Sequence, residues 1–222
     1  MVPGTFTRTA VLFRIEEGWH TYGNTRNDTG FPARFEPVFP PGVELVGEAW
    51  PTPERHVSPG NILDHVYEHG TAIFLDLFVS PTTPPGPVEL GLSVGWLVCR
   101  DACVFEGDSL VVTATVSSPM ALIPAPSSPR VAPYVGRLPR PLTPESGVTT
   151  ERIGEDQVRI SVPGAKGLTF YPALEGATLT HPIEEASVPG NRLDLHLEPG
   201  SGDLTGTLEV RRSGGTEFFR VP

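Results

Sequence analysis

The chain has 222 residues, a formal net charge of −10, 26 prolines and 24 glycines. The negative charge argues against nucleic-acid binding, because no basic stripe is available to neutralise phosphates. No apolar run reaches the roughly eighteen residues of a membrane helix, and the first residues lack the basic and apolar regions of a signal peptide. We therefore expect no direct membrane span in this chain.

Short alternating apolar runs, punctuated by proline and glycine, predict an all-β protein. Phe31–Phe39 contains two prolines and is expected at a sheet edge, whereas Thr71–Val79 is the most apolar run and is expected to be a central strand. Pro51–Asn61 is interpreted as a loop. The other early strand candidates are Thr5–Ile15 and Val43–Trp50. About seven or eight strands within residues 1–117 are typical of an immunoglobulin-like sandwich.

The second half of the chain predicts a separate, smaller β-sandwich. Ser117–Ser146 holds eight prolines and few apolar clusters, which favours a linker with one short helical turn in Arg130–Leu138. The predicted organisation is therefore a first domain at 1–117, a Pro-rich linker at 118–147 and a second sandwich at 148–222. The strands expected in the second sandwich are Gln157–Val162, Leu168–Tyr171, Arg192–Leu197, Leu204–Arg211 and Glu217–Val221.

The only two cysteines, Cys99 and Cys103, are separated by three residues. An alternating strand leads up to Cys99, Val104–Val116 continues as a second strand, and the connection between them is polar. Residues four apart in one extended strand lie about 13 Å apart, whereas a disulfide needs Cα atoms within about 7 Å. A hairpin with a three-residue connection would instead place Cys99 opposite Cys103.

A bond that closes so short a ring adds little stability. The loop-entropy model gives about 2 kcal/mol for five residues, against about 4 to 5 kcal/mol for a hundred. The spacing therefore favours a redox pair in an oxidising compartment. Two alternatives stay open: a binding or scaffold protein with a structural hairpin disulfide, and a copper chaperone.

Other site chemistry finds little support in the sequence. The C-x3-C spacing also occurs in a dinuclear copper site, but that site needs a His and a Met where this chain has Gly107 and Leu110. The histidines that a zinc site would need are not paired at regular spacing. We expect no metal site and no organic cofactor.

Four motifs occur in an order that resembles one known family: G-W-H-T-Y (Gly18–Tyr22), W-P-T-P-E-R (Trp50–Arg55), Y-E-H-G (Tyr67–Gly70) and W-L-V-C-R-D-A-C-V-F-E (Trp96–Glu106). The set resembles the N-terminal periplasmic domain of the DsbD and ScsB thiol:disulfide interchange, or disulfide corrector, family. The tail, with Phe170–Pro172 and Leu204–Val210, is similar to the second β domain of ScsB-type members.

The resemblance implies that Cys99 and Cys103 shuttle between dithiol and disulfide, with Cys103 entering mixed disulfides. His20 and Tyr22 match aromatic positions beside the pair in that family.

The family also has a cap loop that shields its cysteines, and Asp64–Gly70 lies at the matching place. Here Tyr67 and His69 are the candidate shielding residues.

The resemblance further implies a periplasmic or extracytoplasmic protein-disulfide reductase component, of the kind used in cytochrome c biogenesis. Its expected partners are thioredoxin-like oxidoreductases and a membrane-embedded electron-donor module. The membrane and thioredoxin-like modules of full-length relatives are not in this chain, so we expect either a piece of a larger protein or a stand-alone subunit.

Overall fold

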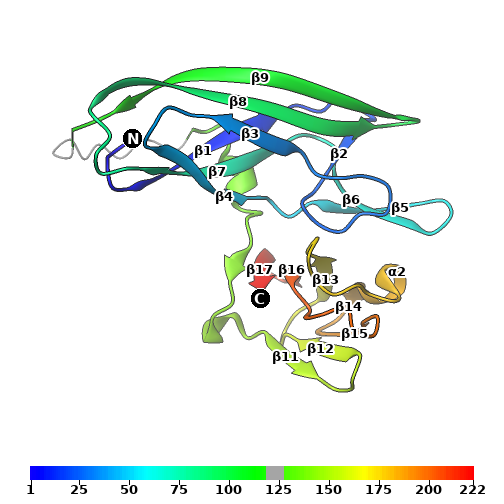
Figure 1. Ribbon diagram of the computed structural model, residues 1–222. Coiled ribbons are helices and arrows are strands. Elements are labelled where there is room, and N and C mark those ends of the chain that lie inside the picture. Colours follow the sequence, from blue (N-terminus) through cyan, green and yellow to red (C-terminus); the bar gives the residue numbers. More distant parts are fainter. Residues whose placement is uncertain (119–127) are drawn as a thin grey trace. The chain divides into compact units, whose positions relative to one another are not determined.

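The computed structural model describes residues 1–118 and 128–222, and their regular secondary structure is almost entirely β-strand (Figure 1). The predicted all-β class is therefore confirmed. The chain divides into two compact units that are both discontinuous in sequence. The first unit consists of Met1–Thr21, Pro32–Pro51 and Tyr67–Val135, and the second of Tyr22–Phe31, Thr52–Val66 and Gly136–Pro222. Residues 119–127 of the predicted linker lie outside the described residues.

One sheet of the first unit has three antiparallel strands in the order β1 (Phe6–Phe13), β7 (Thr71–Val79) and β4 (Val43–Ala49). β7 is the central strand, as its apolar run predicts, and seven of its nine residues are buried. Such a run, apolar at nearly every position, is favourable only where both faces of a strand are covered.

The second sheet of this unit is organised around β8 (Gly86–Cys99), whose neighbours are β2 (His20–Tyr22), β3 (Arg34–Val38) and β9 (Cys103–Val116). β8 and β9 pair along all fourteen residues and run side by side in Figure 1. β3 pairs only with β8 among the described strands, which confirms the predicted edge position. Pro37 has no N–H to donate and is tolerated at such an edge.

The core of the first unit lies between its two sheets. Val43, Leu75 and Leu77 contribute from the first sheet, and Leu90, Leu92 and Val94 from the second. These residues follow the two-residue period of their strands, so each sheet turns one apolar face towards the other. The first unit is therefore the β-sandwich that the sequence predicts.

The second unit also contains two packed sheets. Its five-stranded sheet has the order β10 (Arg140–Pro141), β17 (Gly215–Val221), β16 (Gly206–Arg212), β13 (Gly167–Pro172) and β14 (Ser187–Pro189). Its three-stranded sheet has the order β11 (Thr149–Arg152), β12 (Gln157–Ser161) and β15 (Arg192–His196). Fully buried Leu168, Phe170 and Leu208 of the first sheet and Ile160 and Leu195 of the second belong to one core.

Helices are short throughout the described residues. They comprise α1 (Ala132–Val135), the 3-10 helix η1 (Pro144–Ser146) and α2 (Pro182–Glu185). α1 lies within the segment predicted to form a single helical turn.

Two segments from the first half of the chain belong to the second unit. The prediction that Pro51–Asn61 is a loop is wrong, because β5 (Glu54–Ser58) pairs with β6 (Ile62–Tyr67). Arg55 Nη2 donates to the carbonyl oxygens of Pro182, at 3.0 Å, and Ile183, at 2.6 Å. Arg26 Nη2 donates to the carbonyl oxygen of Gly176 at 2.9 Å. These long-range bonds have no local sequence pattern, and the boundaries 1–117, 118–147 and 148–222 stay a prediction.

Candidate functional site

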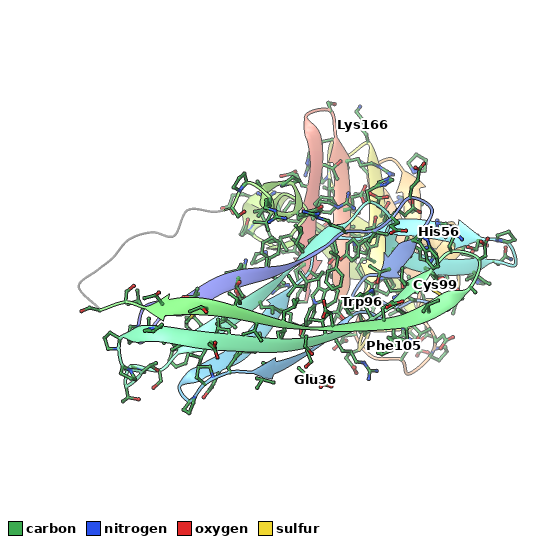
Figure 2. All side chains as sticks on the ribbon, turned by 90° about the horizontal axis from the view of Figure 1, so that it is seen from above. Glu36, His56, Trp96, Cys99, Phe105 and Lys166 are labelled. Carbon is green, nitrogen blue, oxygen red and sulfur yellow. A yellow bond between two sulfur atoms is a disulfide. The ribbon has the colours of Figure 1, made fainter. Side chains whose placement is uncertain are left out.

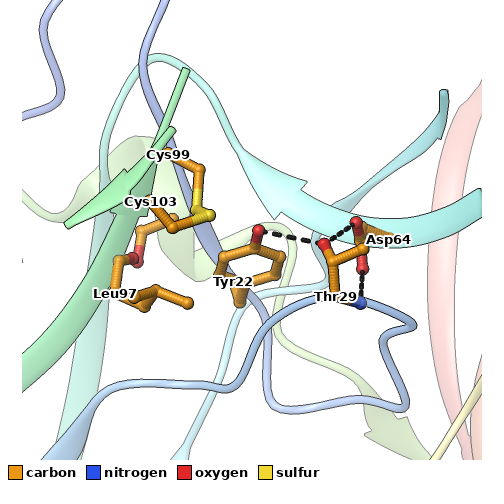
Figure 3. Close-up of a disulfide and its surroundings, with 7 residues drawn as sticks. Tyr22, Thr29, Asp64, Leu97, Cys99 and Cys103 are labelled. Carbon is orange, nitrogen blue, oxygen red and sulfur yellow. Dashed lines mark hydrogen bonds between the residues drawn. A yellow bond between two sulfur atoms is a disulfide. The ribbon is translucent and has the colours of Figure 1, made fainter. Parts of the chain in front are cut away.

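The two cysteines form a disulfide at the tip of the β8–β9 hairpin (Figure 3). Cys99 is the last residue of β8 and Cys103 the first of β9, and the two are direct partners in the antiparallel register. Their Cα atoms lie 4.1 Å apart. In Figure 2, Cys99 lies beyond Trp96 towards one end of the long hairpin. The predicted hairpin pairing is therefore confirmed.

The two cysteines differ in their exposure to solvent. Cys99 is only 3% exposed, whereas Cys103 falls in the exposed class. The cause is the strand arrangement: β2 pairs with β8 at this end, with His20 opposite Cys99, so Cys99 has a strand on each side. In the described part of the chain, β9 pairs with β8 alone, and Cys103 therefore lies at the sheet edge. Cys103 is therefore the more exposed residue of the disulfide.

The hairpin tip is held by contacts from β2 and from Trp19, the residue before it. The buried Thr21 hydroxyl donates to the carbonyl oxygen of Leu97 at 2.8 Å, which ties β2 to the end of β8. The guanidinium of Arg100 lies 4.8 Å from the ring centre of Trp19, a cation–π distance. Arg100 Nε also donates to the Asp101 carboxylate at 3.3 Å. The charge of Arg100, the residue after Cys99, is thus engaged with an aromatic ring and a carboxylate.

Tyr22 belongs to a hydrogen-bonded chain inside the second unit (Figure 3). The Thr29 hydroxyl donates to Asp64 Oδ2 at 2.5 Å, and the Thr29 amide donates to Asp64 Oδ1 at 3.0 Å. Because a carboxylate only accepts, the Thr29 hydroxyl is left to accept from the Tyr22 hydroxyl, 3.2 Å away. Burial raises the pKa of Tyr22, so its hydroxyl keeps its proton.

The segment expected to be a cap loop has a different backbone conformation. Residues 64–67 complete strand β6, and only Glu68 to Gly70 form the connection to β7. Tyr67 is buried and its hydroxyl donates to the carbonyl oxygen of Pro51, whereas His69 is exposed. The prediction of a loop over residues 64–67 is therefore wrong. The shielding role of His20, Tyr22, Tyr67 and His69 stays a prediction.

Several residues that shape the site were missed by sequence reasoning. Thr21, although it lies within G-W-H-T-Y, and Thr29 were not singled out, because their roles depend on hydrogen bonds to Leu97 and Asp64, which are distant in sequence. Glu106 and Asp108 carried a usable signal: they occupy alternate positions in phase with Val104 and Leu110, so they share one face of β9. For metals, the described ranges contain no group of three or more His, Cys, Asp or Glu side chains able to hold an ion.

A β-sandwich with a cysteine pair across one hairpin is the arrangement expected of a thiol–disulfide interchange domain. The family model described as "Thiol:disulfide interchange protein DsbD, N-terminal" matches residues 1–115. The chain belongs to this family, and the resemblance drawn from its motifs is confirmed.

A solved structure agrees in fold. The crystal structure of the N-terminal periplasmic domain of ScsB from Proteus mirabilis is similar with a TM-score of 0.61 and 12% sequence identity, over 99% of this chain and 89% of that chain. Among curated proteins, none matches this chain in sequence. Across residues 1–118 and 128–222, no helix has the length and apolar character needed to cross a membrane.

Proposed function

We propose that this chain acts in the periplasm as a thiol–disulfide exchange domain. In this role it accepts two electrons from a membrane-embedded or thioredoxin-like donor and passes them to partner oxidoreductases through Cys99 and Cys103. Family membership and the similarity to a periplasmic ScsB domain support the proposal. The observation that carries it is the disulfide at the hairpin tip, with Cys103 exposed and Cys99 buried.

The exchange step follows from this difference in exposure. In the reduced domain, the Cys103 thiolate attacks one sulfur of the partner's disulfide, forms a mixed disulfide and releases the first partner thiolate. The Cys99 thiolate then attacks the Cys103 sulfur, closes the internal disulfide and releases the second partner thiolate. Two electrons and two protons pass to the partner, and the donor restores the dithiol by the reverse reaction.

The surroundings of the pair would select partners more than accelerate the chemistry. Direct cross-strand pairing lets the disulfide open and close with little backbone movement. The Thr21–Leu97 hydrogen bond involves neither cysteine, so it would hold β2 next to Cys99 in both redox states and keep one sulfur covered. His20, Tyr22, Tyr67 and His69 remain the candidates for shielding the pair.

A trapping experiment tests the proposal with matched variants. The probe is a thioredoxin-fold protein with a single active-site cysteine, activated as a mixed disulfide with a small aromatic thiol. Cys99→Ser leaves the exposed thiol and should form a covalent complex, seen on a non-reducing gel. Cys103→Ser leaves the buried thiol and should form about tenfold less complex in the same time.

Equal trapping by the two variants would contradict the assigned roles. Absence of any complex with either variant would contradict exchange and favour a structural disulfide. Circular dichroism of both variants checks that the sandwich remains folded.

A further inference from the structure

The first unit has one side on which both of its sheets end. β1 is the last strand of one sheet and pairs with β7, while β9 is the last strand of the other and pairs with β8. In the described residues neither edge has a second strand beside it. The sandwich is therefore not closed between β1 and β9.

A long apolar groove follows this side. A cleft of about 430 Å³ is lined by Val11 and Phe13 of β1, Trp96 of β8, and Val104 and Leu110 of β9.

A second cleft, of about 230 Å³, shares Val11 and Leu110 with the first and extends to Val112 and Ala114. From Val104 to Ala114, the ten steps between successive residues of the extended strand span about 34 Å. The two clefts together, here called the β1–β9 groove, therefore match an extended peptide segment in length.

Carboxylates line the part of the groove nearest the disulfide. Glu106 is the register partner of Trp96 and Asp108 that of Val94, and partners in a sheet share a face. Both carboxylates thus lie on the core-facing side of β9, and Glu16 lines the same cleft. Arg14 is the basic residue of this lining. An apolar floor with an acidic rim is complementary to a ligand that is apolar and basic.

One end of the β1–β9 groove lies next to the redox pair along the chain, although strand alternation places the two cysteines on the opposite face of the hairpin. Val98 precedes Cys99, Val104 follows Cys103, and both valines line the first cleft. A polypeptide whose cysteine reacts with Cys103 would pass around the edge strand β9 to place its neighbouring residues in the groove.

We propose that the β1–β9 groove binds an extended segment of the protein with which Cys103 exchanges, a segment of alternating apolar and basic residues. The apolar side chains cover Val11, Phe13 and Trp96, and a basic side chain pairs with Glu106 and Asp108. The inference deepens the proposed exchange function and rests on it for the identity of the bound protein.

Inward-facing charges on an edge strand have a simpler use, which is to prevent two sheets from joining edge to edge. That role predicts self-association when the charges are removed. It predicts no loss of affinity for a basic peptide.

Peptide binding to the oxidised protein tests the inference. The probe is a fluorescein-labelled peptide of about nine residues that alternates lysine and valine, measured by fluorescence anisotropy at low salt. A second peptide has glutamate in place of lysine. We expect the lysine peptide alone to bind, and the double variant E106Q/D108N to weaken binding about tenfold, the effect of two partly screened charge pairs.

The matched control is E36Q/E44Q, which changes the net charge equally through exposed residues of β3 and β4 outside the groove. It should leave the affinity within about twofold, since distant exposed charges are largely screened. Equal affinity of E106Q/D108N and wild type, equal binding of both peptides, or self-association as the only effect of E106Q/D108N would overturn the inference.

The rate at which dithiothreitol reduces the disulfide separates this test from the proposed function. A small dithiol needs no groove, so wild type and E106Q/D108N should react equally fast. Failure of the trapping experiment with intact peptide binding would reject the exchange function. Failure of peptide binding with intact trapping would reject the groove.

Discussion

The chain contains two prominent hairpins that differ in how their strands are covered. In β8–β9, the outer strand β9 is exposed at twelve of its fourteen positions, and a disulfide closes the three-residue connection. In β16–β17, each strand has seven residues, and Leu208, Val210, Phe219 and Val221 lie in the core of the second unit. One hairpin is thus buried in a core, whereas the other presents a strand to solvent.

This difference indicates where stability and function reside. Burying a large aliphatic side chain contributes about 1.5 to 3 kcal/mol, so the β16–β17 hairpin contributes strongly to folding. β9 contributes much less per residue, because its side chains remain largely in water. A strand with little role in stability can vary in sequence to suit a partner while the sandwich stays folded.

The largest predicted effect is in the buried hairpin. Leu208→Ala leaves a cavity in the core of the second unit and should lower the free energy of unfolding by about 2 to 5 kcal/mol. The matched control is Val111→Ala in β9, where the side chain is 70% exposed, and it should change that free energy by less than about 0.5 kcal/mol. Urea unfolding measures both, and similar losses in the two variants would contradict the comparison.

Acidification should weaken the second unit through His65. Burial lowers the pKa of His65 to about 4, and its Nδ1 lies 2.8 Å from the carbonyl oxygen of Arg26. The unfolded chain, with a histidine pKa of about 6.5, then binds more protons than the folded chain between these values. The stability that neutral His65 contributes is therefore fully present above about pH 6.5 and is lost as the pH falls towards 4.

The expected loss from His65 between pH 7 and pH 5 is about 2 kcal/mol. His65→Asn keeps an amide nitrogen near the position of Nδ1 and removes the titrating group, so this part of the pH dependence should disappear. Urea midpoints of both proteins at pH 7 and pH 5 provide the measurement. If the free energy of unfolding of His65→Asn fell between pH 7 and pH 5 as much as that of wild type, the assignment to His65 would be contradicted.

Reduction of the disulfide should lower the free energy of unfolding by an amount similar to the His65 effect, and this loss should not depend on pH near neutrality. The bond closes a ring of five residues, and its loss should lower the free energy of unfolding by about 2 kcal/mol. Urea unfolding with and without dithiothreitol measures this difference. A loss above about 4 kcal/mol would mean that the bond holds distant structure together, as a purely structural disulfide does.

The smallest predicted effect is at the strand beside Cys99. Thr21→Val keeps the shape of the buried side chain and removes its hydrogen bond to Leu97, so unfolding should become about 1 kcal/mol easier. Thermal unfolding tests this value. In the reduced variant, the Cys99 thiol should also react faster with iodoacetamide, because β2 is held less firmly. An unchanged reaction rate would argue against a covering role for β2.

The features that the sequence predicted correctly are those set by local patterns of residue type and spacing. Thr71–Val79 is apolar at nearly every position and is the central strand β7. The cysteine spacing is compatible with a disulfide only if the chain reverses between them, and it does. The alternation of side chains along β9 also indicates that Glu106 and Asp108 lie on the core-facing side, although charged residues were not expected there.

Other features depend on contacts between distant segments. Glu54–Ser58 lacks a clear apolar alternation and becomes a strand by pairing with β6. Its place in the second unit depends on single hydrogen bonds such as Arg55 to Pro182, 127 positions away. The difference in exposure between Cys99 and Cys103 likewise arises from the pairing of β2, whose place beside the cysteines was expected only through the family resemblance of the G-W-H-T-Y motif.

The exchange function is tested most directly by the reduction potential of the Cys99–Cys103 pair, measured by equilibrating the protein in graded thiol buffers and quantifying the thiols formed. A pair that exchanges disulfides with partners should have a potential of roughly −180 to −270 mV, the range of known exchange proteins. A value well below about −300 mV would mark a structural bond and would contradict the exchange function.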